Sequence, residues 1–309
     1  MDSSTIARMG IGHYIKDIGR GKDGARALGR EQAADLMGQI LDQQISDLEL
    51  GAFCIAMRIK GETPEEMAGF LDATHARLNT VPQGNAPTVV LPSYNGARKL
   101  PVLTPLLALL LARQGVAVLV HGEPTEDKRV SSQAVLAQLG IPALERVTPL
   151  VAGQVQFLPT GVLHTGLARL LAVRRVVGLR NPGHSLVKLM NPCAADSSVL
   201  VVSSYTHPEY LSSMSSTFAL MGQHALLLRG TEGESVADAR RTPAMDVLKN
   251  GQIVRVQEQH AGALLEVPEL PSTDAAATAQ YIQLVLRGEL TVPKPIALQV
   301  QHILNEVTR

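Results

Sequence analysis

The sequence contains no tryptophan, and aromatic residues make up only 3% of it. A base-stacking platform of the kind found in single-strand-binding domains is therefore not expected. The two cysteines, Cys54 and Cys193, lie far apart and outside any CxxC pair. No group of His, Cys or Asp residues has the spacing of a zinc site, and no Walker or GxSxG motif is present. These absences predict a chain of the reducing cytoplasm without a metal ion or cofactor.

Long apolar runs are missing as well. The strongest, Pro105–Ala112, ends at a polar Arg-Gln-Gly sequence and is far shorter than the roughly 20 residues that a membrane-spanning helix needs. The opening residues, MDSSTIARMGIGHYIKD, lack the basic and then apolar pattern of an export signal. We therefore expect no membrane partner and a cytoplasmic location.

The charge balance is neutral, with 28 Lys plus Arg against 28 Asp plus Glu. Judged over the whole chain, this argues mildly against a dedicated nucleic-acid binder. The distribution is uneven, because residues 146–195 contain no acidic residue and another basic segment lies near the start. Such segments are either solvated faces whose cations pair with acids elsewhere, or surfaces for an anionic partner. The cations are Lys16, Arg20, Lys22, Arg26 and Arg30 in the first segment and Arg146, Arg169, Arg174, Arg175, Arg180 and Lys188 in the second.

Helical periodicity dominates residues 1–75. The apolar positions between Leu28 and Leu41 follow helical spacing, and a second helix is predicted to run from near Asp47 to Ile59. A third helix is predicted to begin after Thr63, a good N-cap, because a proline and two glutamates follow it. These helices predict an N-terminal helical domain over residues 1–80.

From residue 88 onward, short β-branched runs alternate with helical segments. This alternation predicts parallel crossover units with functional loops at the carboxyl ends of the strands. The predicted fold class is therefore α/β, with a small N-terminal all-helical domain and a larger α/β domain over residues 85–309 that has a mostly parallel central sheet. The predicted strands are Val89–Leu91, Val116–Val120, Val155–Leu158, Val199–Val202, Ala225–Leu228 and Ile253–Val256.

Several blocks of the sequence carry a resemblance to a known family. They are residues 28–70, the pair GVAVLVHG and VLAQLG at 115–122 and 135–140, and VRRVVGLRNPGHSLVKLMNP at 173–192. They resemble the anthranilate phosphoribosyltransferases and the related nucleoside phosphorylases of glycosyltransferase family 3. The resemblance covers most of the chain and weakens after about residue 260. It implies that fold, dimerisation through the N-terminal helices, and helices near 164–190 packed on them.

The phosphate motifs of those enzymes are degenerate in this chain. Their diphosphate-binding GTGGD loop is replaced by PSYNGAR, which has a single glycine and so lacks the cradle of backbone amides. Their NIST motif falls on VLTP, where only Thr104 could still bind phosphate, and their KHGN becomes VHGE. The resemblance leaves a degenerate phosphate site at Asn95, Gly96, Thr104, His121, Gly122, Lys128, Arg129, Ser131 and Ser132.

The acidic pair that holds magnesium in those enzymes, in a DGLDE sequence, is displaced into RGTEGE at 229–234. Glu232 and Glu234 could bind a metal ion, but two glutamates on a loop are more often solvated surface. Phosphoribosyl transfer depends on positioning a diphosphate and its magnesium. The GTGGD loop, the phosphate-binding lysine of KHGN and the magnesium-binding acidic pair are all lost. No catalytic residue is therefore predicted.

This combination is typical of one branch of the superfamily, the YbiB-type or second TrpD-like proteins. The sequences IGRGK, PSYNGARK, HPEY and RGTEGE point to that branch. The resemblance implies a non-enzymatic homodimer that binds DNA or RNA through the phosphate backbone, without sequence preference. One alternative is a phosphoribosyltransferase or phosphorylase of altered substrate specificity that uses Arg98, Lys99 and Lys128 for phosphate. Another is a scaffold for a protein partner.

The cations that would follow a phosphate backbone come from separate stretches. The glycine-punctuated segment at 16–26 favours an adaptable loop over a charged helix, and cations of the PSYNGARK loop replace the lost amides. Two adjacent arginines on a helix point about 100° apart, so only one of the pair at 174–175 is expected to face a given groove. The predicted nucleic-acid-binding residues are Lys16, Arg20, Lys22, Arg26, Arg98, Lys99, Arg169, Arg174, Arg175, Arg180 and Lys188.

Other features have mainly structural interpretations. His121 is expected to be held at a strand end, and His207–Tyr210 to begin a helix, whose start is an anion site only in principle. Phe53, Ile55 and Met57 lie beside a further apolar residue at 59, beyond what one helix face needs. This excess predicts a second buried surface, as a dimer contact requires.

Overall fold

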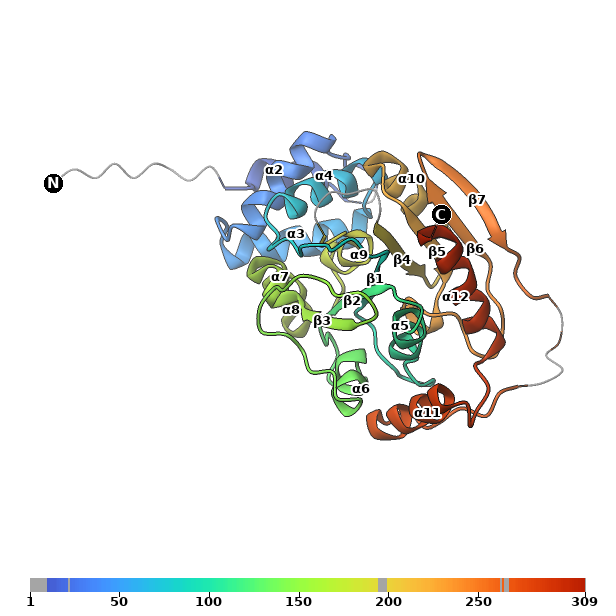
Figure 1. The fold of residues 1–309 in the computed structure, drawn as a ribbon. Coiled ribbons are helices and arrows are strands. Elements are labelled where there is room, and N and C mark those ends of the chain that lie inside the picture. Colours follow the sequence, from blue (N-terminus) through green and yellow to red (C-terminus); the bar gives the residue numbers. More distant parts are fainter. Residues whose placement is uncertain (1–9, 22, 194–198, 262, 264–266, 309) are drawn as a thin grey trace.

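The computed structural model describes residues 10–21, 23–193, 199–261, 263 and 267–308. The chain starts with a group of helices and continues as a sheet with helices on both faces (Figure 1). This arrangement confirms the predicted fold class, an N-terminal helical part followed by α/β structure. The first helices are α1 (Gly12–Ile18), α2 (Arg30–Leu41), α3 (Asp47–Lys60) and α4 (Pro64–His75).

Side-chain caps set the starts of α3 and α4. Ser46 accepts a hydrogen bond from the Glu49 N–H, and Glu49 accepts one from the Ser46 N–H. Thr63 and Glu66 repeat this reciprocal pair at α4. Each pair satisfies backbone donors that have no partner within the helix. With Pro64 in its first turn, α4 begins where the sequence predicts.

The sheet has the strand order β3-β2-β1-β4-β5-β6-β7. Strands β1 to β5 are parallel to one another, whereas β6 and β7 add in antiparallel orientation at one edge. Each predicted strand has a counterpart, but β6 is absent from the prediction. The strands are β1 (Thr88–Ser93), β2 (Ala117–Gly122), β3 (Val155–Pro159), β4 (Val199–Tyr205), β5 (Ala225–Arg229), β6 (Met245–Lys249) and β7 (Gln252–Gln257).

Both faces of the central strands are buried, as is usual for parallel sheets. In β1, Val90 belongs to the core shared with the helical part and α8 to α10, whereas Val89 and Leu91 face α5, α6, α11 and α12. The remaining elements are α5 (Thr104–Ala112), α6 (Ser132–Gln138), α7 (Thr160–Leu163), α8 (Thr165–Val177), α9 (Gly183–Leu189), α10 (Glu209–Met221), the 3-10 turn η1 (Thr231–Gly233), α11 (Ala275–Arg287) and α12 (Lys294–Val307).

Helices α8 and α9 lie between the helical part and the sheet (Figure 1). Leu167 and Leu170 of α8 join the same core as Phe53 of α3 and Phe70 of α4. The carboxyl end of β4 faces the helical part, since Ser204 and Tyr205 line the same cavity as Met57 of α3 and Met67 of α4. Within the described ranges, no helix is both long and apolar enough to cross a membrane.

Candidate functional site

The loop after β1, PSYNGAR, presents backbone N–H donors to a carboxylate of this chain. The N–H groups of Asn95 and Gly96 both point at one carboxylate oxygen, Oε1 of Glu234, at 2.8 Å each. Gly96 has a φ of 69°, which glycine adopts without a side-chain clash. Both N–H groups are bonded to the protein's own carboxylate, so the loss of a diphosphate cradle stays a prediction.

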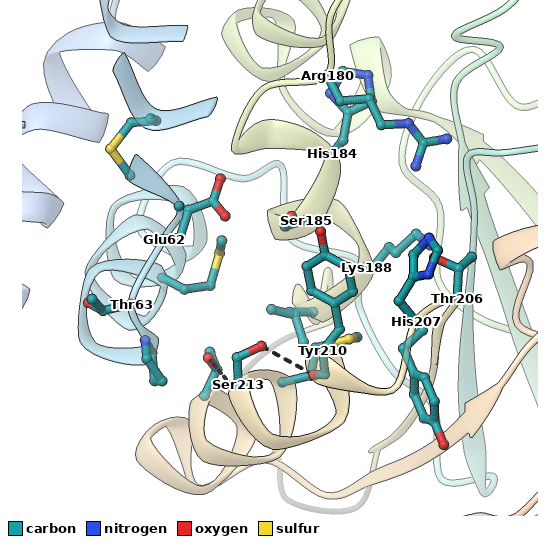
Figure 2. Close-up of a pocket in the computed structure, with 18 of the residues that line it drawn as sticks. Glu62, Thr63, Arg180, His184, Ser185, Lys188, Thr206, His207, Tyr210 and Ser213 are labelled. Carbon is teal, nitrogen blue, oxygen red and sulfur yellow. Dashed lines mark hydrogen bonds between the residues drawn. The ribbon is translucent and has the colours of Figure 1, made fainter. Parts of the chain in front are cut away.

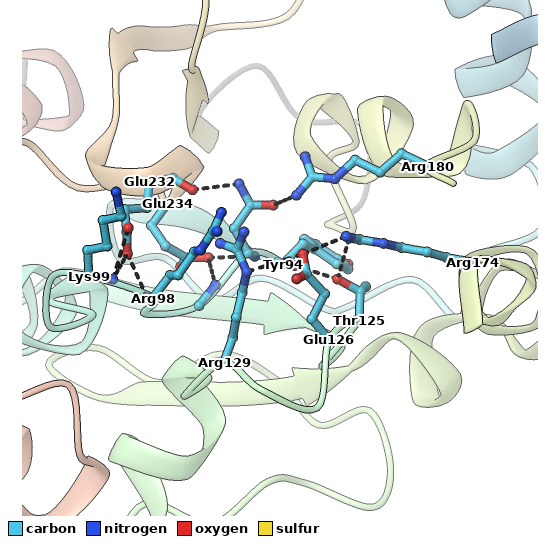
Figure 3. Close-up of polar contacts among 12 residues, drawn as sticks. Tyr94, Arg98, Lys99, Thr125, Glu126, Arg129, Arg174, Arg180, Glu232 and Glu234 are labelled. Carbon is cyan, nitrogen blue, oxygen red and sulfur yellow. Dashed lines mark hydrogen bonds and ion pairs between the residues drawn. The ribbon is translucent and has the colours of Figure 1, made fainter. Parts of the chain in front are cut away.

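Hydroxyl groups complete the surroundings of Glu234. Its Oε2 accepts hydrogen bonds from Ser93 at 2.5 Å and from Thr104 at 3.1 Å. Ser132 Oγ lies 2.7 Å from Ser93 Oγ, at the edge of the same cluster. Glu234 is only 1% exposed, so its carboxylate occupies a buried oxyanion site made of amides and hydroxyls (Figure 3).

Glu232 binds the next part of the loop. Its carboxylate accepts hydrogen bonds from the backbone N–H groups of Arg98 at 2.7 Å and of Lys99 at 3.0 Å. Glu232 itself has a φ of 52°, an uncommon conformation for a residue with a side chain. The prediction that the two glutamates are solvated surface is therefore wrong, most clearly for the buried Glu234.

Arginines gather around this loop at the carboxyl ends of the strands (Figure 3). Arg174 Nη2 lies 2.5 Å and Arg129 Nε lies 3.1 Å from the same Glu126 oxygen. Arg180 donates to Asn95 Oδ1 at 2.9 Å, and its pKa is lowered by burial and by the neighbouring guanidinium groups of Arg174 and Arg129. Such repulsion means that cations outweigh acids here, so an additional anion would be stabilised.

The outer rim of the same edge is more open. The side chains of Arg98, Lys99 and Lys128 are exposed, and none of them has an acidic partner among the described residues. Arg175 is half-exposed and lies 3.5 Å from the exposed Asp127, a weak pair in water. The rim therefore offers cations that are free to contact phosphate groups.

The other predicted cations lie in different surroundings. Arg169 pairs with Asp47 of α3 at 2.6 Å, which links α8 to the helical part. Lys16 lies within α1, so the prediction of a loop from residue 16 is wrong at that residue, whereas Arg26 lies in an exposed loop. Arg20 lies just beyond α1 and pairs weakly with the nearby Asp17. Lys22 lies outside the described residues, and a single groove joining this segment to the strand ends stays a prediction.

Residues at the end of β2 and the start of α6 have structural roles. His121 is fully buried, its Nδ1 lies 2.8 Å from Tyr94 Oη, and burial lowers its pKa to about 3. Gly122 packs against the backbone of Ser93, and Ser131 caps α6 by accepting from Ala134 N–H. His121 thus lies buried at the end of β2 beside Tyr94, and its part in a degenerate phosphate site stays a prediction.

A cavity of about 390 Å³ lies beside this site, between the turn joining α3 to α4, helix α9 and the start of α10 (Figure 2). Methionines from α3, α4 and α10 give it an apolar part. The predicted helix start at HPEY is confirmed, and it forms one wall. Its polar lining includes Arg58, Glu62, Arg180, His184, Lys188 and Tyr210.

The polar groups of this cavity are strongly affected by burial. Burial and the neighbouring Arg180 lower the pKa of Lys188 to about 8, and its Nζ donates to Gly233 O at 2.9 Å. Burial also raises the pKa of the Glu62 carboxyl group. His184 accepts from the Asn181 N–H through Nδ1, while its buried Nε2 has no partner within the described residues. The cavity therefore has polar groups left for a small ligand.

Sequence reasoning did not select Arg58 and Glu62 for this cavity. The family motifs around Arg180 and Lys188 gave a signal for the α9 wall. The opposite wall comes from the end of α3 and the turn to α4. The sequence pattern there predicted only the end of one helix and the start of the next. Glu234 was selected only as a displaced metal ligand, because its loop partners lie more than a hundred residues earlier in the chain.

A family model, similar sequences and solved structures all relate this chain to the family that its sequence resembles. Residues 13–77 match the helical bundle domain of a glycosyl transferase family. A protein of Escherichia coli (strain K12) named "Uncharacterized protein YbiB" is 39% identical over 293 residues, covering 93% of this chain and 91% of that protein. An anthranilate phosphoribosyltransferase of Anaeromyxobacter dehalogenans (strain 2CP-C) is 30% identical over 299 residues, covering 93% and 86%.

Solved structures show the same fold. The anthranilate phosphoribosyltransferase of Thermus thermophilus is similar with a TM-score of 0.74 and 22% identity, covering 95% of this chain and 89% of that one. The Saccharomyces cerevisiae enzyme in complex with PRPP and Mg is similar with a TM-score of 0.68 and 15% identity, covering 96% and 86%.

Proposed function

Because the chain belongs to the YbiB-type branch of the anthranilate phosphoribosyltransferase superfamily, we propose that it binds the phosphate backbone of DNA or RNA on this scaffold without transferring a phosphoribosyl group. One observation carries the proposal. The donors that could hold a diphosphate are already bonded to Glu234 and Glu232, while the side chains of Arg98 and Lys99 face solvent. We therefore expect an anionic partner to contact these two side chains at the surface rather than to be enclosed by the backbone donors of the loop.

The charge around the loop supports a polyanionic partner. Arg129 and Arg174 share one glutamate, and within the described ranges Arg180 has only an amide oxygen as its acceptor. Lys and Arg side chains that follow a backbone bind it without reading sequence. The few aromatic residues fit this view, because they offer little base stacking.

A salt titration tests this function. Binding of two unrelated oligonucleotides should weaken steeply with salt and to a similar extent for both. Replacing Arg98 and Lys99 together by Glu should weaken binding at low salt by tenfold or more, and should reduce the slope of log affinity against log salt by about 2, since two phosphate contacts are lost.

The matched control changes the same amount of charge elsewhere. Lys249 and Lys294 are exposed and lie at the end of β6 and the start of α12, so Lys249→Glu with Lys294→Glu should leave the slope nearly unchanged. The proposal fails if the wild-type protein binds neither oligonucleotide at low salt. It also fails at this surface if both double variants behave alike.

We also propose that the chain forms a homodimer through α3. Leu48, Ile55 and Ile59 are exposed and lie on one face of this helix. Phe53 and Met57 are fully buried within the single chain, so their predicted part in a second surface is wrong. Burial of an apolar helix face against its symmetry mate is a common dimer contact.

Sedimentation velocity at micromolar concentration should therefore show a dimer. Replacing Leu48 and Ile59 by Glu should shift it to a monomer, because two charges would be buried in the contact. The exposed Glu65 lies on the neighbouring helix α4, and Glu65→Lys should leave the dimer intact. A wild-type monomer would rule out this contact.

A phosphoribosyltransferase or phosphorylase of altered specificity is the second candidate. The comparisons by themselves favour it, since the relatives with a named activity are anthranilate phosphoribosyltransferases. The cavity with Lys188 and His184 is the feature that supports it, because its polar groups could still bind a small substrate. Steady turnover of PRPP that stops when magnesium is chelated would favour this candidate, and its absence with several acceptors would favour nucleic-acid binding.

A further inference from the structure

We propose that Glu232 and Glu234 are internal anions that take the place of bound phosphate and hold the loop after β1 so that Arg98 and Lys99 present their side chains to an external polyanion. The two glutamates would thus be positioning residues for that contact. This inference rests on the proposed nucleic-acid binding for its consequence, but the locking of the loop can be tested without nucleic acid.

Both carboxylate oxygens of Glu234 have hydrogen-bond donors. One oxygen accepts two backbone N–H groups, and the other accepts the hydroxyls of Ser93 and Thr104. These donors come from the end of β1, from the following loop and from the start of α5. Buried donors of this kind need an acceptor, and an unmet one is costly. The carboxylate therefore fixes three segments relative to one another.

The loop that carries Glu232 and Glu234 is also held by hydrogen bonds to its backbone carbonyl groups. Gly233 O accepts from Ser204 Oγ at 2.9 Å and from Lys188 Nζ at 2.9 Å. Asn95 Nδ2 donates to Glu232 O at 2.9 Å, so the loop after β1 also binds the backbone of the glutamate loop and not only its two carboxylates. A loose surface loop would not have its carbonyl groups held by a strand, a helix and the opposite loop.

Glu232 contacts the backbone, not the side chains, of Arg98 and Lys99 in the loop after β1. The Glu232 carboxylate accepts from the backbone N–H groups of Arg98 and Lys99 and, at 3.5 Å, of Leu100, while the side chains of Arg98 and Lys99 are exposed (Figure 3). The acid thus neutralises neither side chain through an ion pair. It bonds their N–H groups on the inner side, which leaves the cations pointing outward.

Removal of the Glu232 carboxylate should change oligonucleotide affinity in opposite directions for a positioning role and for a purely electrostatic one. Removing an acid from a surface that binds a polyanion should strengthen binding if only charge matters. If Glu232 positions the loop, Glu232→Ala should instead weaken oligonucleotide binding by about tenfold. Glu232→Gln keeps an oxygen acceptor for the N–H groups, so it should retain most of the affinity. Asp127 is an exposed acid on the same edge, and Asp127→Ala should bind as tightly as wild type or more tightly.

The experiment combines binding of a labelled mixed-sequence oligonucleotide at fixed ionic strength with hydrogen exchange of the free protein. In Glu232→Ala the amides of residues 98 and 99 should exchange at least tenfold faster, while those of β2 stay protected. Tighter binding by Glu232→Ala, or unchanged exchange at residues 98 and 99, would overturn the inference. If wild type binds no oligonucleotide, the proposed function fails, and the exchange result alone then decides whether the glutamates lock the loop.

Discussion

Acidification from pH 7 to pH 5 is expected to lower the free energy of unfolding by several kcal/mol. Burial lowers the pKa of His75 to about 4 and the pKa values of His121 and His184 to about 3. Unfolded histidines titrate near pH 6.5. Below that pH these histidines bind protons in the unfolded chain but stay neutral in the folded protein. Their contribution to the free energy of unfolding is therefore fully present above pH 6.5 and is lost as the pH falls toward their pKa values in the folded protein.

The size of the effect follows from the number of protons. Each such histidine contributes at most about 1.4 kcal/mol per pH unit, so three together approach about 4 kcal/mol for each unit below pH 6.5. Urea unfolding between pH 5 and pH 7.5 measures this slope. His184→Asn should reduce the slope by about one proton. A stability that does not change across this range would contradict the neutral buried histidines.

Replacing Glu66 by Ala is expected to destabilise the helical part by about 3–5 kcal/mol, because the change leaves a buried cation without its partner. Glu66 is 0% exposed, and its carboxylate lies 2.6 Å from Lys60 Nζ, whose side chain is only 8% exposed. It also accepts from the N–H groups of Leu28 and Thr63, each at 2.9 Å. One side chain therefore joins the segment before α2, the end of α3 and the start of α4.

Thermal or urea unfolding of Glu66→Ala measures this loss. The neighbouring Glu65 is exposed, so Glu65→Ala should change the free energy of unfolding by less than about 0.5 kcal/mol. Replacing both Lys60 and Glu66 by Met should cost less than Glu66→Ala alone, since no charge is then left buried. A small loss in Glu66→Ala would mean that water reaches Lys60 once the carboxylate is gone.

The fold could be predicted from local patterns because the main elements have local causes. Thr63 and Pro64 mark the start of α4, and the buried parallel strands are short β-branched runs. Strand β6 has no such run, since Asp246 interrupts it. Asp246 is buried and pairs with Arg255 of β7 at 2.6 Å. This partner is brought close by the pairing of β6 with β7.

The site was less predictable for the same physical reason. Thr104 was selected for a degenerate phosphate site, and in the structure its hydroxyl donates to Glu234. The stretch without acids at 146–195 left two interpretations open, cations that pair with acids elsewhere or a surface for an anionic partner. Folding brings acids from elsewhere to two of these cations, Asp47 to Arg169 and Glu126 to Arg174. Composition along the chain cannot report such partners, because ion pairs depend on distance in space.

Glu234 in its oxyanion site also sets how the protein responds to small phosphates. A group tethered to the chain acts at an effective concentration fixed by the fold, commonly millimolar or far above it in rigid structures. Free phosphate or diphosphate would have to displace this buried carboxylate from its four donors before binding. The shape of the loop should therefore stay the same whether phosphorylated metabolites are abundant or scarce.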